Sequence, residues 1–181
     1  MTSLTIFCSS KLTVNNTFYE PCKNLITLLN NDFKYVYGGG SDGLMGCINR
    51  ICIKNGYHTT GVNCKRWKDE GDNKLNEVVY FDSIIDRQNE LIRRGDGYIV
   101  LPGGVGTIYE ALQCITLNDI KESNKPVFFL NVNKYFNSLF NMLDDGRIMG
   151  TIGKTNSEMN IIIRDNPIDL ANEIKKYFKS N

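Results

Sequence analysis

The chain has 181 residues with 21 basic and 20 acidic side chains, and its formal net charge is +1. Its 41 % apolar and 23 % charged residues are typical of a globular domain and exclude a disordered, collagen-like or coiled-coil chain. Balanced charge provides no electrostatic footprint for nucleic acid or an anionic membrane, and no apolar run approaches the roughly 20 residues of a membrane span. Residues 1–8 lack the features of a signal peptide. We therefore expect a cytoplasmic protein whose partners include neither nucleic acid nor a membrane.

Short apolar runs rich in β-branched and aromatic residues alternate with segments of helical periodicity, which predicts an α/β fold with a parallel sheet. Strands are expected at residues 4–8, 34–37, 58–62, 77–81, 97–101, 127–132 and 161–163. Helices are expected at residues 18–29, 44–55, 83–94, 107–120, 135–143 and 168–178. The polar residues 65–76 are expected to form the one long loop, in a position to lie over a site. No repeat, low-complexity tract or Pro/Gly linker divides the chain, so we expect one domain over residues 1–181.

The cysteines give no sign of a metal site. They stand at positions 8, 22, 47, 52, 64 and 114 with no C-x-x-C spacing, and the single histidine, His58, has no cysteine or carboxylate at a metal-ligand interval. Free cysteines are among the residues most often buried, and disulfides are rare in a reducing compartment. We therefore predict buried thiols and no bound metal.

Two glycine-rich loops follow predicted strands, where ligands bind in open parallel sheets. The first, residues 37–46 (YGGGSDGLMG), contains a G-x-G-x-x-G match at Gly38, Gly40 and Gly43, which permits close approach to a phosphate or ribose. A dinucleotide-binding fold would have this motif after its first strand, whereas here it follows the second, so NAD is disfavoured. A tight turn that lets a helix pack closely on a strand is the structural alternative.

The second loop, residues 99–110 (IVLPGGVGTIYE), also leads from a strand into a helix. Its glycines leave backbone N–H groups uncovered at the positive end of the helix dipole, which predicts an anion site for one phosphate. No G-x-x-x-x-G-K-[ST] motif accompanies it, so a monophosphate fits better than a triphosphate. Glu110 has two interpretations: a capping box with Thr107, or a carboxylate within reach of a ribose.

The helix expected at residues 83–94 carries polar groups on its inner face. Gln88 lies near the centre of its apolar arc and Arg87 at the edge, and buried polar groups need partners. Arg87 either pairs with Glu90 on its own helix or points into the cleft. The apolar arc itself consists of Ile84, Ile85, Leu91 and Ile92.

In order and spacing, the motif GGGSDGLMG at 38–46, then Arg87, then PGGVGTIYE at 102–110 resemble the LOG ("Lonely guy") family of cytokinin riboside 5′-monophosphate phosphoribohydrolases. The resemblance extends over nearly the whole chain, and P-G-G-x-G-T-x-x-E is specific to this family and its near relatives. It implies a Rossmann-like, doubly wound homodimer that splits the N-glycosidic bond of N6-modified AMP, giving free base and ribose 5-phosphate without a cofactor. Some members have been labelled lysine decarboxylases, but nothing in this sequence indicates a pyridoxal phosphate site.

By motif, the resemblance implies that Arg87 is the catalytic arginine and Glu110 the catalytic glutamate. The sequence departs from the family where Met-His-x-Arg-Lys is usual, because Ile85 and Gln88 replace the histidine and the lysine. The further substrate contacts that the resemblance implies are Ser10, Gly40, Gly43, Met45, Asp69, Gln88, Gly103, Gly104, Val105, Gly106, Thr107, Ile108, Tyr109 and Thr116.

Three hypotheses for function follow. The first is hydrolysis of an N6-modified adenosine 5′-monophosphate, in which Glu110 stabilises an oxocarbenium-like state and positions water while Arg87 fixes the geometry. The second is a general purine nucleoside monophosphate nucleosidase, and the third a non-catalytic nucleotide-binding module on the same fold. The predicted helix at 107–120 has more apolar surface than one sheet face requires, which fits the implied dimer or simple core burial.

Overall fold

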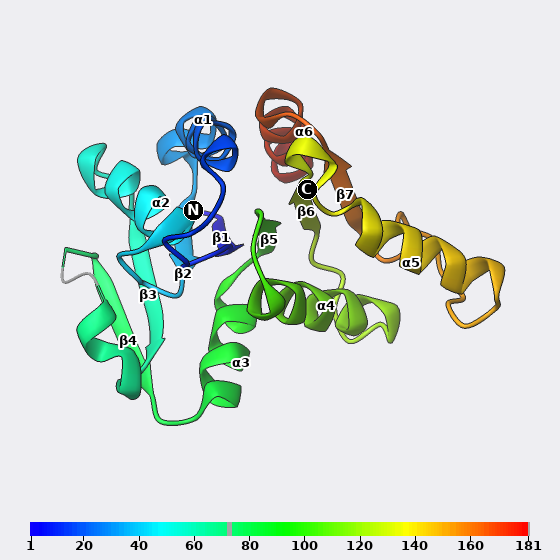
Figure 1. Cartoon of the computed structure of the whole chain (residues 1–181), viewed down its shortest axis with the longest axis horizontal. Helices are drawn as coiled ribbons and strands as arrows, with labels where there is room; N and C mark the ends of the chain where they lie inside the picture. The colour runs from blue at the N-terminus through cyan, green and yellow to red at the C-terminus, as the bar shows by residue number, and fades with distance from the viewer. Residues whose placement is uncertain (72–73, 181) are drawn as a thin grey trace.

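The structure is a computed structural model that describes residues 1–71 and 74–180 (Figure 1). One parallel sheet of seven strands has the order β4-β3-β2-β1-β5-β6-β7. The predicted α/β, Rossmann-like fold is therefore confirmed. The strands are β1 (Ser3–Phe7), β2 (Lys34–Tyr37), β3 (Thr59–Cys64), β4 (Glu77–Phe81), β5 (Gly97–Val100), β6 (Val127–Leu130) and β7 (Ile161–Arg164).

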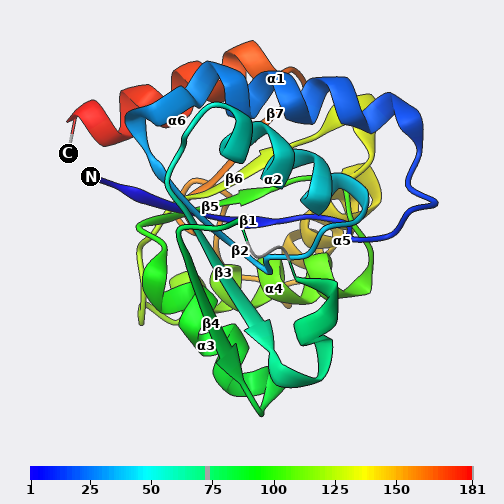
Figure 2. The ribbon, with the colours of Figure 1, turned by 90° about the vertical axis from the view of Figure 1, so that its left-hand side faces the viewer.

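The helices of the described residues cover both faces of the sheet. Figure 2 shows α1, α2 and α6 on one face, with α3 and α4 on the other, and α5 packs on the same side as α3 and α4. Each face has its own apolar core. The helices are α1 (Tyr19–Leu29), α2 (Gly43–Lys54), α3 (Ile84–Arg94), α4 (Val105–Asp119), α5 (Asn137–Ile148) and α6 (Pro167–Ser180).

Successive side chains of the central strands enter these two cores alternately. In β1, Leu4 and Ile6 pack with the α1, α2 and α6 core, whereas Phe7 packs with the opposite one. In β5, Ile99 packs with the core of α1, α2 and α6, and Tyr98 packs with the core on the opposite face. Because both faces of a parallel sheet are covered, such strands are continuous apolar runs, which is why the sequence predicted them closely.

Several element boundaries differ from the sequence prediction, most of all those of α5. α4 begins at Val105, two residues early, and β6 ends at Leu130, with a 3-10 turn, η4 (Val132–Lys134), after it. α5 covers Asn137–Ile148 rather than 135–143. Gly146 lies within this helix, and its lack of a side chain leaves room for Ile152. A Cβ added to Gly146 would lie 2.8 Å from Ile152 Cδ1.

The polar segment predicted as a long loop contains regular structure in its first part. A 3-10 turn, η3 (Lys65–Glu70), follows β3, and Gly71 then forms an antiparallel bridge with Gly40. Residues 72 and 73 of the predicted loop lie outside the described residues. The bridge places the end of η3 against the first glycine loop.

The chain reverses its direction of travel across the sheet between β1 and β5. It moves outward from β1 to β4, and β5 then pairs with the free edge of β1. A ligand site is expected at this switch point, beyond the carboxyl ends of the strands. The loops that meet there follow β1, β2, β5 and β6.

All six cysteines are buried and free, as predicted. Among the described residues, no helix has the length and apolar character that crossing a membrane requires.

Candidate active site

The glycine loop after β5 presents an uncapped helix N-terminus. Gly104 is the N-cap of α4 and no side chain caps this end, so the first-turn N–H groups of α4 face outward. An added Cβ on Gly104 or Gly106 would meet no atom within 4 Å, whereas on Gly103 it would lie 2.1 Å from Thr107 Oγ1. The loop is therefore closed by Thr107 on one side and open at Gly104 and Gly106, which is the shape of an anion cradle.

Thr107 is buried inside the first turn of α4 and is not its N-cap, so the capping box considered from the sequence does not form. Glu110 instead accepts a hydrogen bond from Arg87, with 2.7 Å between Nη1 and Oε1. Both side chains are nearly closed off from solvent, at 11 % and 12 % exposure. This buried ion pair joins α3 to α4 beside the glycine loop.

Arg87 is held by backbone as well as by charge. Ser83 is the N-cap of α3, and its hydroxyl oxygen accepts hydrogen bonds from the N–H groups of Ile85 and Asp86. Arg87 Nε donates to the carbonyl of Val62 in β3, 3.1 Å away. The intrahelical pair with Glu90 does not form, since Glu90 binds Arg93 and Arg94.

Gly38 provides the space for the guanidinium. A Cβ built on Gly38 would lie 2.7 Å from Arg87 Nη2, closer than side chains tolerate. Sequence reasoning missed this role because the glycine motif was interpreted only as a phosphate or turn motif. A glycine directly after β2 therefore leaves the space that the side chain of Arg87 on α3 occupies.

Burial governs the electrostatics of Glu110. Desolvation raises the pKa of its carboxyl above the usual value, while the charge and hydrogen bond of Arg87 act in the opposite direction. A carboxylate with a raised pKa accepts a proton more readily near neutral pH, which suits a general base. The carboxylate of Glu110, held in place by Arg87, can therefore both stabilise a nearby positive charge and accept a proton.

The first glycine loop packs tightly on the loop after β1. Gly43 has φ +59°, and a Cβ there would lie 2.7 Å from the carbonyl oxygen of Lys11. Met45 N–H donates to the carbonyl of Ser9, and Gly40 N–H approaches Met45 Sδ at 3.2 Å. These contacts support the structural alternative for Gly43, whereas Gly40 is half-buried at the bridge to Gly71.

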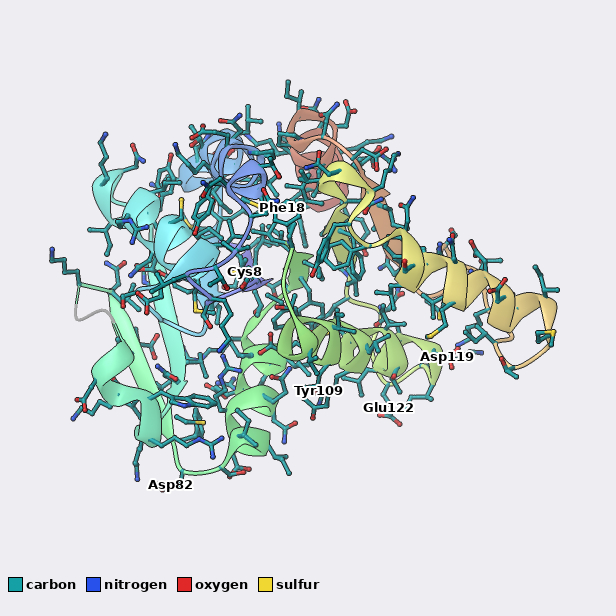
Figure 3. All side chains as sticks on the ribbon, viewed as in Figure 1. Cys8, Phe18, Asp82, Tyr109, Asp119 and Glu122 are labelled. Atoms are coloured by element: carbon teal, nitrogen blue, oxygen red, sulfur yellow. The ribbon has the colours of Figure 1, made fainter. Side chains whose placement is uncertain are left out.

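The remaining predicted residues do not all lie beside the Arg87–Glu110 pair. Ser10 and Asp69 are exposed, in the loop after β1 and in η3, and Gln88 is buried in α3 with no partner for Nε2 among the described residues. Tyr109 lies on the outer side of α4 (Figure 3), with Ile108 and Val105 in the same two turns. Thr116 is exposed and lies about 13 Å along α4 from Thr107. Its hydroxyl donates to the carbonyl of Leu112 in the same helix, so within a single copy of the chain Thr116 does not contact Glu110.

Sequence reasoning also missed Tyr135, whose hydroxyl donates to the carbonyl of Gly103 at 2.7 Å. The one available signal was position, because Tyr135 shortly follows β6 at the edge where the site loops converge. Nothing in its immediate neighbours identified a partner.

Comparison with known proteins identifies the family. The sequence model described as "Possible lysine decarboxylase" matches residues 45–174. A protein of Arabidopsis thaliana named cytokinin riboside 5′-monophosphate phosphoribohydrolase LOG4 is 33 % identical over 177 residues, covering 95 % of this chain and 81 % of the relative. The chain belongs to the LOG family. A probable LOG4 enzyme of Oryza sativa subsp. japonica is 30 % identical, over 95 % of this chain and 76 % of the relative.

Solved structures share the LOG-type fold. The Moco carrier protein from Chlamydomonas reinhardtii has a TM-score of 0.75 at 15 % identity, with 99 % of each chain covered. The molybdenum cofactor binding protein from Rippkaea orientalis has a TM-score of 0.74 at 16 % identity, over 98 % of this chain and 97 % of that one. At such identities the likeness shows the fold alone.

Proposed function

We propose that this LOG-family chain hydrolyses the N-glycosidic bond of an N6-modified adenosine 5′-monophosphate, releasing the free base and ribose 5-phosphate. The observation that carries the proposal is the buried Arg87–Glu110 pair, 2.7 Å between Nη1 and Oε1, beside the open N-terminus of α4. The named activity of the relatives supports the same reaction. Sequence identity near 30 % supports the class of reaction more strongly than it supports the identity of the base that is released.

In this mechanism the glycine loop anchors the phosphate and so fixes the ribose. The first-turn N–H groups of α4 bind the phosphate oxygens, which contributes orientation. The Glu110 carboxylate faces the anomeric carbon, stabilises its developing positive charge and accepts a proton from the attacking water. The water oxygen becomes the new hydroxyl on the ribose as the bond to the base nitrogen breaks. The proton that Glu110 took from the water passes to the departing base, and the carboxylate is restored. Arg87 holds Glu110 in position throughout.

The test compares wild type with Glu110→Ala on N6-isopentenyl-AMP and on AMP, with free base measured by chromatography. We expect wild type to release isopentenyladenine and the variant to lose about 100-fold or more of the turnover with little loss of binding. Release of adenine from AMP at an equal rate would favour the general nucleosidase. Turnover retained by Glu110→Ala would contradict the role of Glu110.

A non-catalytic binding module is the second candidate function. The feature in its favour is Gln88, which stands where the family usually has a lysine and whose Nε2 has no hydrogen-bond partner among the described residues. Under this alternative both nucleotides would bind saturably and be recovered intact after long incubation. The same chromatography therefore separates the two candidates.

A further inference from the structure

The loop after β6, residues 131–136, reaches across to the phosphate cradle. Tyr135 Oη donates to the carbonyl oxygen of Gly103 at 2.7 Å. The Tyr135 ring lies edge-on against Phe18, with ring centroids 5.2 Å apart. Figure 3 shows Phe18 at the start of α1, next to the segment that follows β6. The tyrosine is thus fixed at its ring and at its hydroxyl.

The backbone that carries Tyr135 is itself held firmly. Asn133 and Lys134 have φ of 53° and 59°, a conformation that side chains seldom adopt without surrounding support. Asn131, which is buried, provides that support by accepting from Phe136 N–H at 2.8 Å and by donating to Asn137 at 2.9 Å.

A further bond ties the loop to the start of the fold. Asn133 Nδ2 donates to Thr17 Oγ1 at 3.1 Å, next to Phe18 in η1 (Asn16–Phe18). The loop is therefore attached both to η1 and to the glycine loop. Such a loop places a hydroxyl at one point instead of letting it move with solvent.

The hydrogen bond to Gly103 orients a peptide unit that glycine leaves free. Neither Gly103 nor Gly104 has a side chain to restrict its backbone, so the peptide between them has no local preference. The C=O and N–H of a trans peptide point in opposite directions, so holding the carbonyl of Gly103 toward Tyr135 directs the N–H of Gly104 away from it. Gly104 is the N-cap of α4, where the open cradle begins.

We propose that Tyr135 is a positioning residue for the 5′-phosphate: its hydroxyl fixes the Gly103–Gly104 peptide, and with it the N-terminus of α4, before the nucleotide binds. This inference rests on the proposed function and names the residue that sets its phosphate affinity. A site organised in advance loses less entropy on binding, so removal of the hydroxyl weakens phosphate binding without touching the catalytic pair.

The test is Tyr135→Phe, which keeps the ring against Phe18 and removes only the hydroxyl. The matched control is Tyr35→Phe, because Tyr35 Oη also donates to a backbone carbonyl, that of Asn30 at 2.6 Å, away from the cradle. Calorimetry measures the Kd for ribose 5-phosphate, and kinetics measure KM and kcat for N6-isopentenyl-AMP. Thermal unfolding of both variants measures the loss of stability.

We expect Tyr135→Phe to raise the Kd and the KM about five- to tenfold with a smaller change in kcat, as loss of one organising hydrogen bond would do. Tyr35→Phe should keep both constants at the wild-type values even where it lowers Tm as much. Wild-type Kd and KM in Tyr135→Phe, or equal increases in both variants, would overturn the inference.

The proposed function fails separately. If wild type binds ribose 5-phosphate but cleaves no nucleotide, the enzyme proposal is wrong while the Kd comparison still decides the role of Tyr135. If wild type neither binds ribose 5-phosphate nor cleaves the nucleotide, both proposals are wrong.

Discussion

Glu110 is a buried carboxylate whose charged partner among the described residues is Arg87, and that combination controls how its protonation is linked to folding. An ion pair with little exposure loses much of its hydration, and the attraction to Arg87 offsets only part of this cost. Burial accordingly raises the pKa of the Glu110 carboxyl in spite of the arginine. The residue proposed to do the chemistry is also one that the fold holds at a cost.

We predict that the contribution of Glu110 to stability falls as the pH rises. A carboxyl whose pKa is raised by folding binds its proton more tightly in the native state, so this stabilisation is complete below the unfolded-state pKa and is lost as the pH rises through the native value. The measurement is the free energy of unfolding in urea, wild type minus Glu110→Gln, between about pH 4 and pH 7. This difference should decrease with pH.

Glu90 is the matched control with the opposite sign. The hydrogen bond from Arg93, followed by that from Arg94, lowers the pKa of Glu90 to about 2. The stability that Glu90 contributes is therefore present at neutral pH and is lost as the pH falls toward the native value, so wild type minus Glu90→Gln should increase with pH. A flat or increasing difference for Glu110→Gln would show that its environment does not disfavour the charge.

At this scale the sequence indicated Arg87 and Glu110 as candidates but not that they pair with each other. Helical periodicity placed Arg87 at the edge of an apolar arc and left both Glu90 and the cleft open as partners. The choice depends on α4 lying beside α3, and that follows from the pairing of β5 with β1. Gly38 was unexplained for the same reason, because its neighbour Arg87 comes from a distant segment.

At the scale of the element, α4 begins without a side-chain cap, and this open end is the proposed phosphate site. A sequence pattern of Thr107 followed by Glu110 predicts a cap, yet the helix begins earlier, at Val105, and neither side chain caps it. The N–H groups that a cap would satisfy remain available to a ligand. The boundary was predicted wrongly because the local rule assumes that a helix satisfies its own end.

Gly106→Ala should affect stability and affinity in opposite directions. Nothing lies within 4 Å of the added Cβ, so alanine in the first turn should raise the free energy of unfolding by about 0.5–1 kcal/mol. The same methyl group enters the open cradle and should raise the KM for the nucleotide about tenfold, equivalent to about 1.4 kcal/mol. Urea titration and steady-state kinetics measure the two effects.

Gly153→Ala is the control, since its added Cβ also meets nothing within 4 Å and the residue lies beyond α5, away from the cradle. This substitution should leave KM unchanged. An unchanged KM in Gly106→Ala as well would mean that no ligand approaches the first turn of α4.

At the scale of the whole molecule, one face of the protein carries a stripe of exposed apolar side chains along α4. Val105, Tyr109 and Ile120 are 86 %, 53 % and 58 % exposed along the outer side of α4, and Thr116 lies on the same stripe. Exposed apolar surface of this kind marks interaction sites. We propose that two copies of the chain associate through this stripe as an isologous homodimer, so that any contact of Thr116 with substrate requires the second copy.

Ile120→Glu should convert the dimer to a monomer in light-scattering chromatography, because two-fold symmetry buries the new charge twice. Ile168→Glu is the matched control: Ile168 is 59 % exposed on α6, on the opposite face of the sheet (Figure 2), and its substitution should leave the dimer intact. A monomeric wild type would instead mean that the stripe does not mediate self-association.

The predicted strands and helices were nearly all correct because apolar runs and helical periodicity are local signals. Strand order is not local, and so the sequence could not show that β5 returns to the free edge of β1. The site depends on that return, since it brings Glu110 of α4 next to Arg87 of α3. The pairing of β5 with β6 then places the loop of Gly103 next to the loop after β6, where Tyr135 stands. Loops with no shared sequence signal therefore remained unconnected until the topology was known.

The pairing of β1 with β5, which joins Leu4 to Gly97, also has a consequence for the order of folding. Contacts between distant segments pay their loop-closure entropy before they return any stability, so they form late. A nascent chain that ends after β4 has four strands and an open β1 edge, but no place for a nucleotide. We therefore expect the site to form only when β5 closes that edge, and local detachment of β5 to remove the glycine loop after β5 and the Arg87–Glu110 pair together.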